Sequence, residues 1–276
     1  MEISSAFEIG ITDYRKIINT VKEVYGYDFN EFALTSFKRR IERFIQLFGL
    51  VHPDALIIRL KNDISFFNIF LKEVLVESTE MFRDPSFWRY LRDELLSTLL
   101  KESKHPRIWF PFCVSGDELY TFCIVLSETN LKDKFTVIAH YPNEILLESI
   151  KNGEFKNYKF EISKENYERF VGKNDFENYF IIDKQSIKRN ISYIENVTFI
   201  KQNVNFDNSE NEISLIICRN RLIYFTQTMH DKVLKIFHNS IQSSGFLALG
   251  IKEQPGLISQ NLFKPFNINE SIYKKI

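Results

Sequence analysis

The sequence predicts an α/β protein made of two parts, an N-terminal helical bundle over residues 1–76 and a Rossmann-like, doubly wound α/β domain over residues 77–276. The first part shows only the apolar spacing of amphipathic helices. The second part contains short apolar runs that alternate with helical patterns, which is typical of a parallel sheet covered by helices. From about residue 155 to 200, polar and apolar residues alternate instead, which predicts a small antiparallel insertion.

The composition argues against several classes of function. The 36 basic and 36 acidic residues cancel, so no net charge favours binding to nucleic acid or to a membrane surface. The N-terminal residues lack the pattern of a signal peptide, and the apolar runs are too short to span a membrane. Cys113, Cys123 and Cys218 cannot all pair, and their spacing is not that of metal ligands. We therefore expect a cytoplasmic protein with reduced cysteines, no metal ion, no membrane insertion and no nucleic-acid partner.

Helices are expected throughout the N-terminal part. The first is predicted to be capped by Thr12 or Asp13, with its inward positions at Ile17, Ile18, Val21 and Val24. The clearest helix lies within residues 32–50 and ends at Gly49; its apolar stripe consists of Leu34, Phe37, Ile41, Phe44, Ile45 and Phe48. Further helices are expected after His52-Pro53 and from Ile64 onward.

Arg39, Arg40 and Arg43 give the second of these helices a basic face. Such a face is commonly just solvated, and the alternative is a docking surface for an acidic partner protein. The sequence leaves both interpretations open.

Residues 107–128 form the unit around which the α/β domain is organised. Residues 108–112 are predicted to form a buried strand, and residues 113–116 a tight turn. Ser115 is the expected N-cap of the next helix, and Glu118 would complete a capping box with it. Ligands of doubly wound domains bind at the carboxyl ends of strands, beside such a helix N-terminus. An ordinary βα turn without a ligand is the alternative.

The remaining elements are predicted in the same way. Residues 135–139 form a second buried strand, and Pro142 is the expected first residue of a helix that Gly153 ends. A helix near residues 164–170 and two alternating segments are assigned to the insertion. The alternating segments are residues 178–187 and 197–204. The later elements are a strand at 213–218, a helix capped by Thr226, a strand at 245–250 and an edge strand at 271–276.

Four stretches together resemble one known family. They are STEMFRDPSFW (78–88), VSGDELYT (114–121), CRNRLIYF (218–225) and GFLALGIKE (245–253). Their order and spacing are similar to those of the CheR family, chemotaxis receptor methyltransferases that transfer a methyl group from S-adenosylmethionine to glutamate side chains. The resemblance implies a helical domain with a basic helix and a methyltransferase domain with a small antiparallel subdomain. It also implies an acidic signalling protein such as a chemoreceptor as the partner, contacted by the Arg39, Arg40 and Arg43 helix and by the insertion.

The resemblance implies roles for particular residues. Arg83 would hold the incoming carboxylate near the methyl group, and Tyr224 would line the same site, so these two are the candidate catalytic residues. The candidate cofactor-binding residues are Thr79, Arg83, Ser115, Asp117, Asn203, Val204 and Asn220. Asp117 stands where the family has an acid near the methionine end of the cofactor. A glutamate carboxylate is already ionised at pH 7, so this chemistry needs positioning rather than a catalytic base.

Each of these residues also has a structural interpretation. Arg83 could pair with Asp84 or cap a helix, and Asn203 and Asn220 could be turn residues. Tyr224 could belong to the core with its hydroxyl group satisfied. Four such residues in the order of the family favour the functional interpretation.

The chain departs from the family pattern around the cofactor. Pro111 and Phe112 replace small residues that let the backbone approach the ligand. Tyr141 stands where the family has an acid for the ribose hydroxyls, and a phenol cannot replace the two bonds that a carboxylate accepts. Each lost charge-assisted bond costs roughly 1.5–3 kcal/mol. Arg221 brings a cation where the family has an aliphatic residue.

Two hypotheses follow from this comparison. The first is a working methyltransferase with an altered ribose pocket. The second is a catalytically inactive relative that keeps the fold and a protein-binding surface but binds S-adenosylmethionine weakly or not at all.

Overall fold

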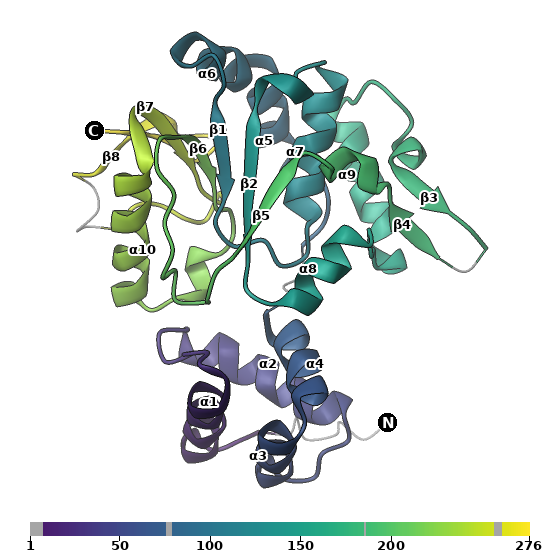
Figure 1. Cartoon of the computed structure of the whole chain (residues 1–276), viewed down its shortest axis with the longest axis vertical. Helices are drawn as coiled ribbons and strands as arrows, with labels where there is room; N and C mark the ends of the chain where they lie inside the picture. The colour runs from purple at the N-terminus through teal and green to yellow at the C-terminus, as the bar shows by residue number, and fades with distance from the viewer. Residues whose placement is uncertain (1–7, 76–78, 185, 257–260) are drawn as a thin grey trace.

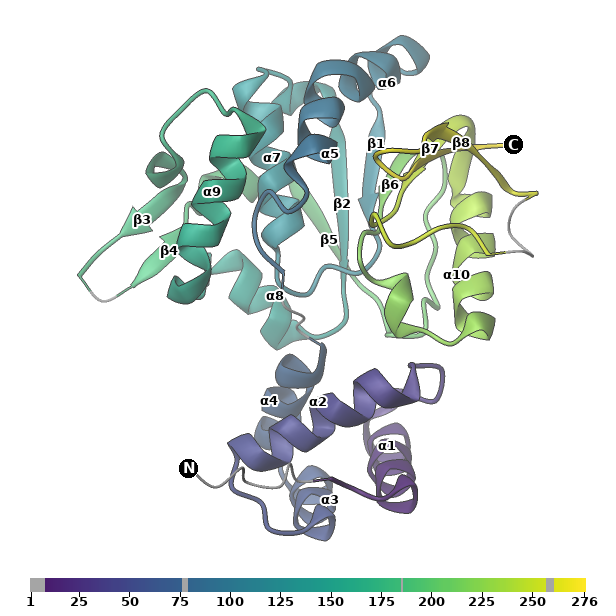
Figure 2. The same cartoon turned by 180° about the vertical axis from the view of Figure 1, so that it is seen from behind.

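The computed structural model describes residues 8–75, 79–184, 186–256 and 261–276. Four N-terminal helices form one body, and a sheet with helices on both faces forms a second body above it (Figure 1). A hairpin and a helix project from one side of the sheet (Figures 1 and 2). In the described ranges, no helix is both long and apolar enough to cross a bilayer.

The helical bundle is confirmed, and it consists of α1 (Ile11–Tyr25), α2 (Leu34–Leu47), α3 (Pro53–Asn62) and α4 (Ile64–Leu75). Its core is rich in aromatic rings, with Phe37, Phe44, Phe66, Phe67 and Phe70 all buried. Phe44 meets the rings of Phe66 and Phe70 edge-on, with centroids 5.4 and 5.1 Å apart, which is a favoured aromatic geometry.

Two details of the first helix differ from the prediction. Gly10 is the N-cap of α1 and no side chain caps the helix, so Thr12 and Asp13 lie inside it. Val24 is 44% exposed, whereas Ile17, Ile18 and Val21 are buried as expected.

The α/β domain contains a seven-stranded sheet in the order β5-β2-β1-β6-β7-β9-β8. The parallel strands are β1 (Arg107–Phe110), β2 (Thr136–Tyr141), β5 (Val197–Lys201), β6 (Ile213–Ile217) and β7 (Ile241–Ala248). The last two strands are β8 (Phe263–Asn267) and β9 (Ile272–Lys275), and β9 runs antiparallel between β7 and β8. The chain order reverses between β1 and β6, so a ligand site is expected at the carboxyl ends of these two strands.

Helices cover both faces of this sheet (Figures 1 and 2). They are α5 (Pro85–Tyr90), which continues through a π turn into α6 (Leu96–Glu102), α7 (Asp117–Glu128), α8 (Glu144–Lys151) and α10 (Gln227–Ser240). Successive residues of β1 point to opposite faces, so Trp109 packs in the core of the α10 side while Ile108 and Phe110 pack in the core of the α7 side. The predicted cap of α10 is confirmed, because the Thr226 side chain accepts a hydrogen bond from the Met229 amide.

The antiparallel insertion is smaller than predicted. It contains α9 (Phe160–Phe170) and a hairpin of β3 (Phe180–Ile182) and β4 (Ile187–Arg189). Residues 197–201, predicted to belong to it, instead form β5 at the edge of the main sheet and pair in parallel with β2. An edge strand is half exposed, so its alternation looks the same in a parallel sheet as in a hairpin.

The C-terminal strand also differs from the prediction. Residues 272–275 form β9 inside the sheet rather than at its edge, because β8 pairs with its outer side. The strand β8 was not predicted from the sequence. It carries Pro265, which a strand at the edge of a sheet tolerates because one side of its backbone needs no partner.

The helix α8 begins two residues later than predicted. Asn143 is its N-cap and accepts a hydrogen bond from the Ile145 amide at 2.8 Å, so Pro142 lies outside the helix. Gly153 follows its end with φ at +67°, as expected of a helix stop. A Cβ atom on Gly153 would lie only 2.2 Å from the carbonyl oxygen of Arg189 in β4, so this position is closed to a side chain.

We expect Gly153→Ala to destabilise the protein by at least about 2 kcal/mol, because left-handed strain adds to a backbone clash. Gly49→Ala is the matched control, since Gly49 has φ at +60° but nothing within 4 Å of the added Cβ. It should cost only about 1 kcal/mol. Thermal unfolding measures both, at roughly 2–4 °C per kcal/mol. Equal losses in the two variants would contradict the close contact with Arg189.

The helical bundle covers the carboxyl ends of the strands. The Tyr27 hydroxyl donates to the Pro142 carbonyl at 2.8 Å, just after β2. The Asn203 side chain, just after β5, donates to the Gly26 carbonyl at 3.0 Å. After β6, the Tyr224 carbonyl accepts from the Ala33 amide at 2.8 Å. The bundle therefore closes the edge of the sheet at which a ligand site is expected.

Candidate functional site

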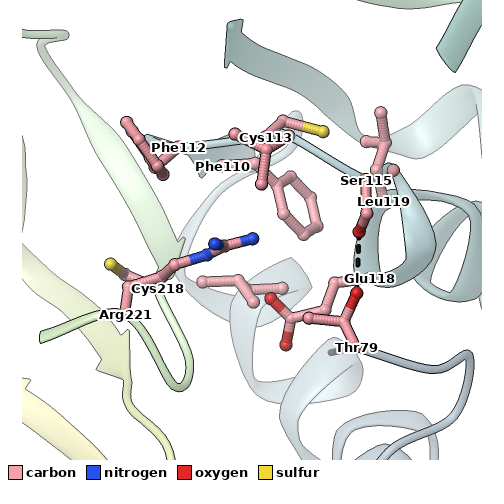
Figure 3. A pocket seen from close by; sticks show the side chains of 12 residues that line it. Thr79, Phe110, Phe112, Cys113, Ser115, Glu118, Leu119, Cys218 and Arg221 are labelled. Atoms are coloured by element: carbon pink, nitrogen blue, oxygen red, sulfur yellow. Dashed lines mark hydrogen bonds between the residues drawn. The ribbon is translucent and has the colours of Figure 1, made fainter. Parts of the chain in front are cut away.

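A small pocket lies where β1 and β6 end and α7 begins. Its lining comes from the loop after β1, the first turn of α7, the end of β6 and Thr79 (Figure 3). The cavity volume is about 20 Å³. Roughly 10–15 Å³ of such space holds one water molecule, so the pocket in this conformation is nearly closed.

The turn before α7 is built on Gly116. This residue is the N-cap, with φ at +78°, and no side chain caps the helix. The predicted capping box of Ser115 and Glu118 is therefore wrong, because glycine takes the left-handed position directly before the helix. The Ser115 hydroxyl instead bonds with the Thr79 hydroxyl at 2.8 Å and accepts from the Asp117 amide at 3.3 Å.

Asp117 faces the insertion and is not among the residues that line this pocket. Its carboxylate oxygens lie 3.0 Å from the Lys159 ammonium group and 3.0 Å from the Arg189 guanidinium group, and all three side chains are buried. The Thr79 hydroxyl donates to the same carboxylate at 2.6 Å. Asp117 thus holds the insertion to the start of α7, a role that differs from the cofactor contact expected for it.

Glu118 is the acid that lines the pocket, and sequence reasoning assigned it only to a cap. Its side chain extends into the pocket from one side, and that of Arg221 extends from the opposite side (Figure 3). Burial raises the pKa of the Glu118 carboxyl above its ordinary value, while the charges of Arg219 and Arg221 oppose this rise. The pair of adjacent acids at the start of α7 was the signal that could have found Glu118.

Arg219 connects the segments around the pocket. Its guanidinium group lies 2.6 Å from the Asp84 carboxylate and 3.3 Å from the Glu118 carboxylate, and it donates to the Arg83 carbonyl at 3.3 Å. It also lies over the ring of Phe87 at 4.1 Å. The Arg219 side chain is almost fully buried. Its contacts with Arg83 and Asp84 join the segment after Thr79 to the end of β6.

Glu253 fixes the turn that carries Asn220. Its carboxylate accepts hydrogen bonds from the amides of Asn220 and Gly250, each at 2.7 Å, and from that of Ile223 at 3.2 Å. Asn220 adopts a left-handed conformation with φ at +57°, so the turn interpretation of this residue is correct for its backbone. Neither Arg219 nor Glu253 was singled out in the sequence.

Arg83 lies next to Arg219, and the side chain of Arg83 is partly exposed. Its Nε atom is 3.8 Å from the Glu80 carboxylate, and its carbonyl accepts from the Trp88 indole at 2.9 Å. The alternative pairing of Arg83 with Asp84 is not what the structure shows, because Asp84 pairs with Arg219. The charge of Arg83 is also felt at Glu118, where it lowers the pKa.

Tyr224 is joined to the helical bundle. The Arg40 guanidinium group lies over its ring at 4.2 Å and donates to the Val74 carbonyl at 2.9 Å. Arg40 is therefore half-buried between Tyr224 and α4, and its part in a docking surface stays a prediction. Arg39 and Arg43 remain exposed on α2.

The other candidate residues lie outside the pocket. The Tyr141 hydroxyl is 3.3 Å from both Glu144 oxygens, and Asn203 bonds to the bundle and to the Val204 amide. Val204 is fully buried in the core. Phe112 does line the pocket, where its ring packs on Phe206 with the centroids 5.8 Å apart. The structure thus gathers Thr79, Ser115 and the missed Glu118 with Arg221, and it leaves Tyr141, Asn203, Val204 and Asn220 away from the cavity.

Comparison with known proteins agrees with this architecture. Residues 12–75 match the family model described as the CheR methyltransferase all-alpha domain, and residues 77–272 match the CheR methyltransferase SAM binding domain. A Pseudomonas putida protein named "Putative methyltransferase Cher3" is 30% identical over 264 residues, which cover 95% of this chain and 96% of that protein. The "Chemotaxis protein methyltransferase" of Listeria monocytogenes is 27% identical over 88% of this chain and 90% of its own. The chain therefore belongs to the CheR methyltransferase family.

Proposed function

We propose that this protein transfers a methyl group from S-adenosylmethionine to glutamate side chains of a chemoreceptor in the cytoplasm. The observation that carries the proposal is the meeting of Glu118, Arg221 and Thr79 in one pocket at the carboxyl ends of β1 and β6, with Arg83 beside it. Several relatives of similar length are named as chemotaxis protein methyltransferases. Cys113, Cys123 and Cys218 are all buried, and we expect them to stay reduced in that compartment.

The donor set of the pocket fits the amino-acid end of S-adenosylmethionine. This end carries an ammonium and a carboxylate group, and Glu118 and Arg221 present the complementary charges from opposite walls. The hydroxyl groups of Thr79 and Ser115 lie beside them. When bound, the cofactor supplies a methyl group on a positively charged sulfur, which a carboxylate can attack directly.

The nucleoside end of S-adenosylmethionine fits this pocket less well than the amino-acid end does. The cavity of about 20 Å³ is far below the roughly 300–1,000 Å³ of pockets that enclose small organic ligands. Phe112 occupies part of the lining, and Tyr141 holds Glu144 at the end of β2. Binding of the whole cofactor therefore requires Phe112 to move away from the cavity.

The chain's own residues position the acceptor. The glutamate substrate is ionised near neutral pH, so no base is needed. Arg83 offers a planar fork of donors that suits a carboxylate, and Arg219 fixes its backbone. The helical bundle covers the same edge of the sheet and limits the access of water, while Arg40 holds the ring of Tyr224. Arg39 and Arg43 on α2, together with the insertion, would contact the acidic partner.

The second candidate function is a cofactor-free protein-binding module. The observation that favours it is the nearly closed pocket with Phe112 in its lining. In this case the fold and the exposed surfaces of α2 and the insertion would remain, while the pocket would have lost its ligand.

Calorimetric titration with S-adenosylhomocysteine distinguishes the two functions. The methyltransferase proposal expects saturable binding to the wild type, tighter binding to Phe112→Ala and weaker binding to Glu118→Gln. The loss in Glu118→Gln should be about one to two decades, since one charge-assisted bond contributes roughly 1.5–3 kcal/mol. Thermal unfolding of each variant confirms that it is folded. No binding to either the wild type or Phe112→Ala at millimolar ligand would overturn the methyltransferase proposal in favour of the binding module.

A further inference from the structure

A second and larger cavity lies on the other side of the turn that precedes α7. Its volume is about 220 Å³, and residues of α8, the insertion and α4 of the helical bundle contribute to its lining. Val114 and Ser115 line both cavities, and the hydrogen bonds that join Thr79 to Ser115 and Asp117 form part of the wall between them. The second cavity is therefore a neighbour of the cofactor pocket and not a part of it.

Positive charge dominates this cavity. Its lining contains five cations and two carboxylates, which are Lys72, Lys156, Lys159, Lys188, Arg189, Asp117 and Glu154. The deepest cations, Lys159 and Arg189, have side chains only 7% and 2% exposed. These two share the single buried carboxylate of Asp117, so the interior keeps one uncompensated positive charge. A buried charge without a counter-charge is costly, which favours an anionic ligand here.

Arg189 is held in a fixed position to receive such a ligand. One end of its guanidinium group pairs with Asp117, and the other donates to the Ser115 carbonyl at 2.9 Å. The group also lies over the ring of Tyr120 at 4.5 Å. Its Nε atom is buried and has no hydrogen-bond partner among the residues that the structure describes. The wall of the cavity thus contains a buried cation that its neighbours hold in place.

We propose that this cavity binds a small phosphate-bearing molecule. Five cations against two carboxylates leave an excess of three, which suits the charge of about −1.5 to −2 on a phosphate monoester. Arginine and lysine side chains with hydroxyl groups, here those of Ser115, Ser149 and Ser186, are typical partners of phosphate oxygens. The volume is below the usual range for enclosed organic ligands, so the ligand is a compact one. Lys156 and Lys188 are exposed at the rim, where they can close on the phosphate.

Calorimetry at constant ionic strength tests the proposal with ribose 5-phosphate and inorganic pyrophosphate as probes. Succinate, a dicarboxylate, is the control for simple charge attraction. The wild type should bind the phosphate probes in preference to succinate, and the double variant K156Q/K188Q should lose at least about tenfold in affinity. Lys235→Gln is the matched control, since Lys235 is exposed on α10 and is not among the lining residues.

Each outcome decides for or against the proposal. Preferential binding that K156Q/K188Q weakens and Lys235→Gln preserves supports it. No binding, equal binding of succinate or an equal loss in Lys235→Gln overturns it. Because K156Q and K188Q are surface substitutions, the double variant should stay folded. The probes involve neither S-adenosylmethionine nor a protein substrate, so failure here leaves the proposed methyltransferase function untouched.

Discussion

Asp117→Asn should lower the melting temperature of the protein by about 10 °C. The substitution removes the carboxylate that Lys159 and Arg189 share and leaves two buried cations next to each other. Breaking a buried ion pair in this way costs about 3–5 kcal/mol, and for a chain of this size each kcal/mol lowers the melting temperature by roughly 2–4 °C. Thermal unfolding monitored by circular dichroism measures the shift.

The control for this prediction is Asp133→Asn. Asp133 is exposed and takes no part in the contacts around Asp117, so its loss should change the melting temperature little. Similar shifts in the two variants would contradict the central role of Asp117 in holding the insertion to α7.

The Asp117→Asn variant also tests, through its melting temperature, whether an anion binds in the second cavity. With Asp117 neutralised, both Lys159 and Arg189 lack a counter-charge, so an anion in the cavity compensates more charge than it does in the wild type. Pyrophosphate should therefore raise the melting temperature of Asp117→Asn more than that of the wild type, by the linkage between binding and folding. An equal rise in both proteins would argue that the anion binds elsewhere.

The elements that the sequence predicted well are those with strong local signals. The apolar run of β1 and the cap of α10 each depend on neighbouring residues, and the structure confirms both. The predicted stripe of α2 is confirmed at its four central positions, whereas Leu34 is 43% exposed and Phe48 follows the end of the helix. The strand β5 was assigned to the wrong sheet because its alternation is the same in both settings. The internal position of β9 depends on its pairing with β8, which lies outside the local sequence.

Part of the candidate site was also predictable, because it depends on local sequence motifs. Of the motif around Thr79 and Arg83, Thr79 lines the pocket and the Arg83 carbonyl bonds to Arg219 beside it. The choice between Asp117 and Glu118 was not predictable, because consecutive helical residues point about 100° apart and either one could face the pocket. It is decided by Lys159 and Arg189, which lie 42 and 72 residues further along the chain. Arg40 is half-buried because of the way the bundle packs on Tyr224, which the pattern of α2 alone does not reveal.

Arg83→Met should lower kcat/KM for methylation of a chemoreceptor fragment by about one to two decades. In the proposed function Arg83 orients the acceptor carboxylate, and one charge-assisted interaction contributes roughly 1.5–3 kcal/mol, or about a decade for each 1.4 kcal/mol. The fold should be unaffected, because the Arg83 side chain is partly exposed. Arg219 donates to the Arg83 carbonyl, which the substitution keeps. Transfer of a labelled methyl group to the fragment, with the cofactor saturating, measures the loss.

Two readouts separate this positioning role from an indirect effect. Binding of S-adenosylhomocysteine should be nearly unchanged in Arg83→Met, since the cofactor's charged end is assigned to Glu118 and Arg221 instead. Arg15→Met, on the exposed face of α1, should leave both measurements at the wild-type level and thereby control for the loss of one arginine. If Arg83→Met keeps full activity, the acceptor carboxylate is held by another cation, and Arg219 is excluded from that role because it is buried against Asp84 and Glu118. If it loses cofactor affinity and activity together, Arg83 belongs to the cofactor site, where the arginine completes the charges around Glu118 rather than orienting the substrate.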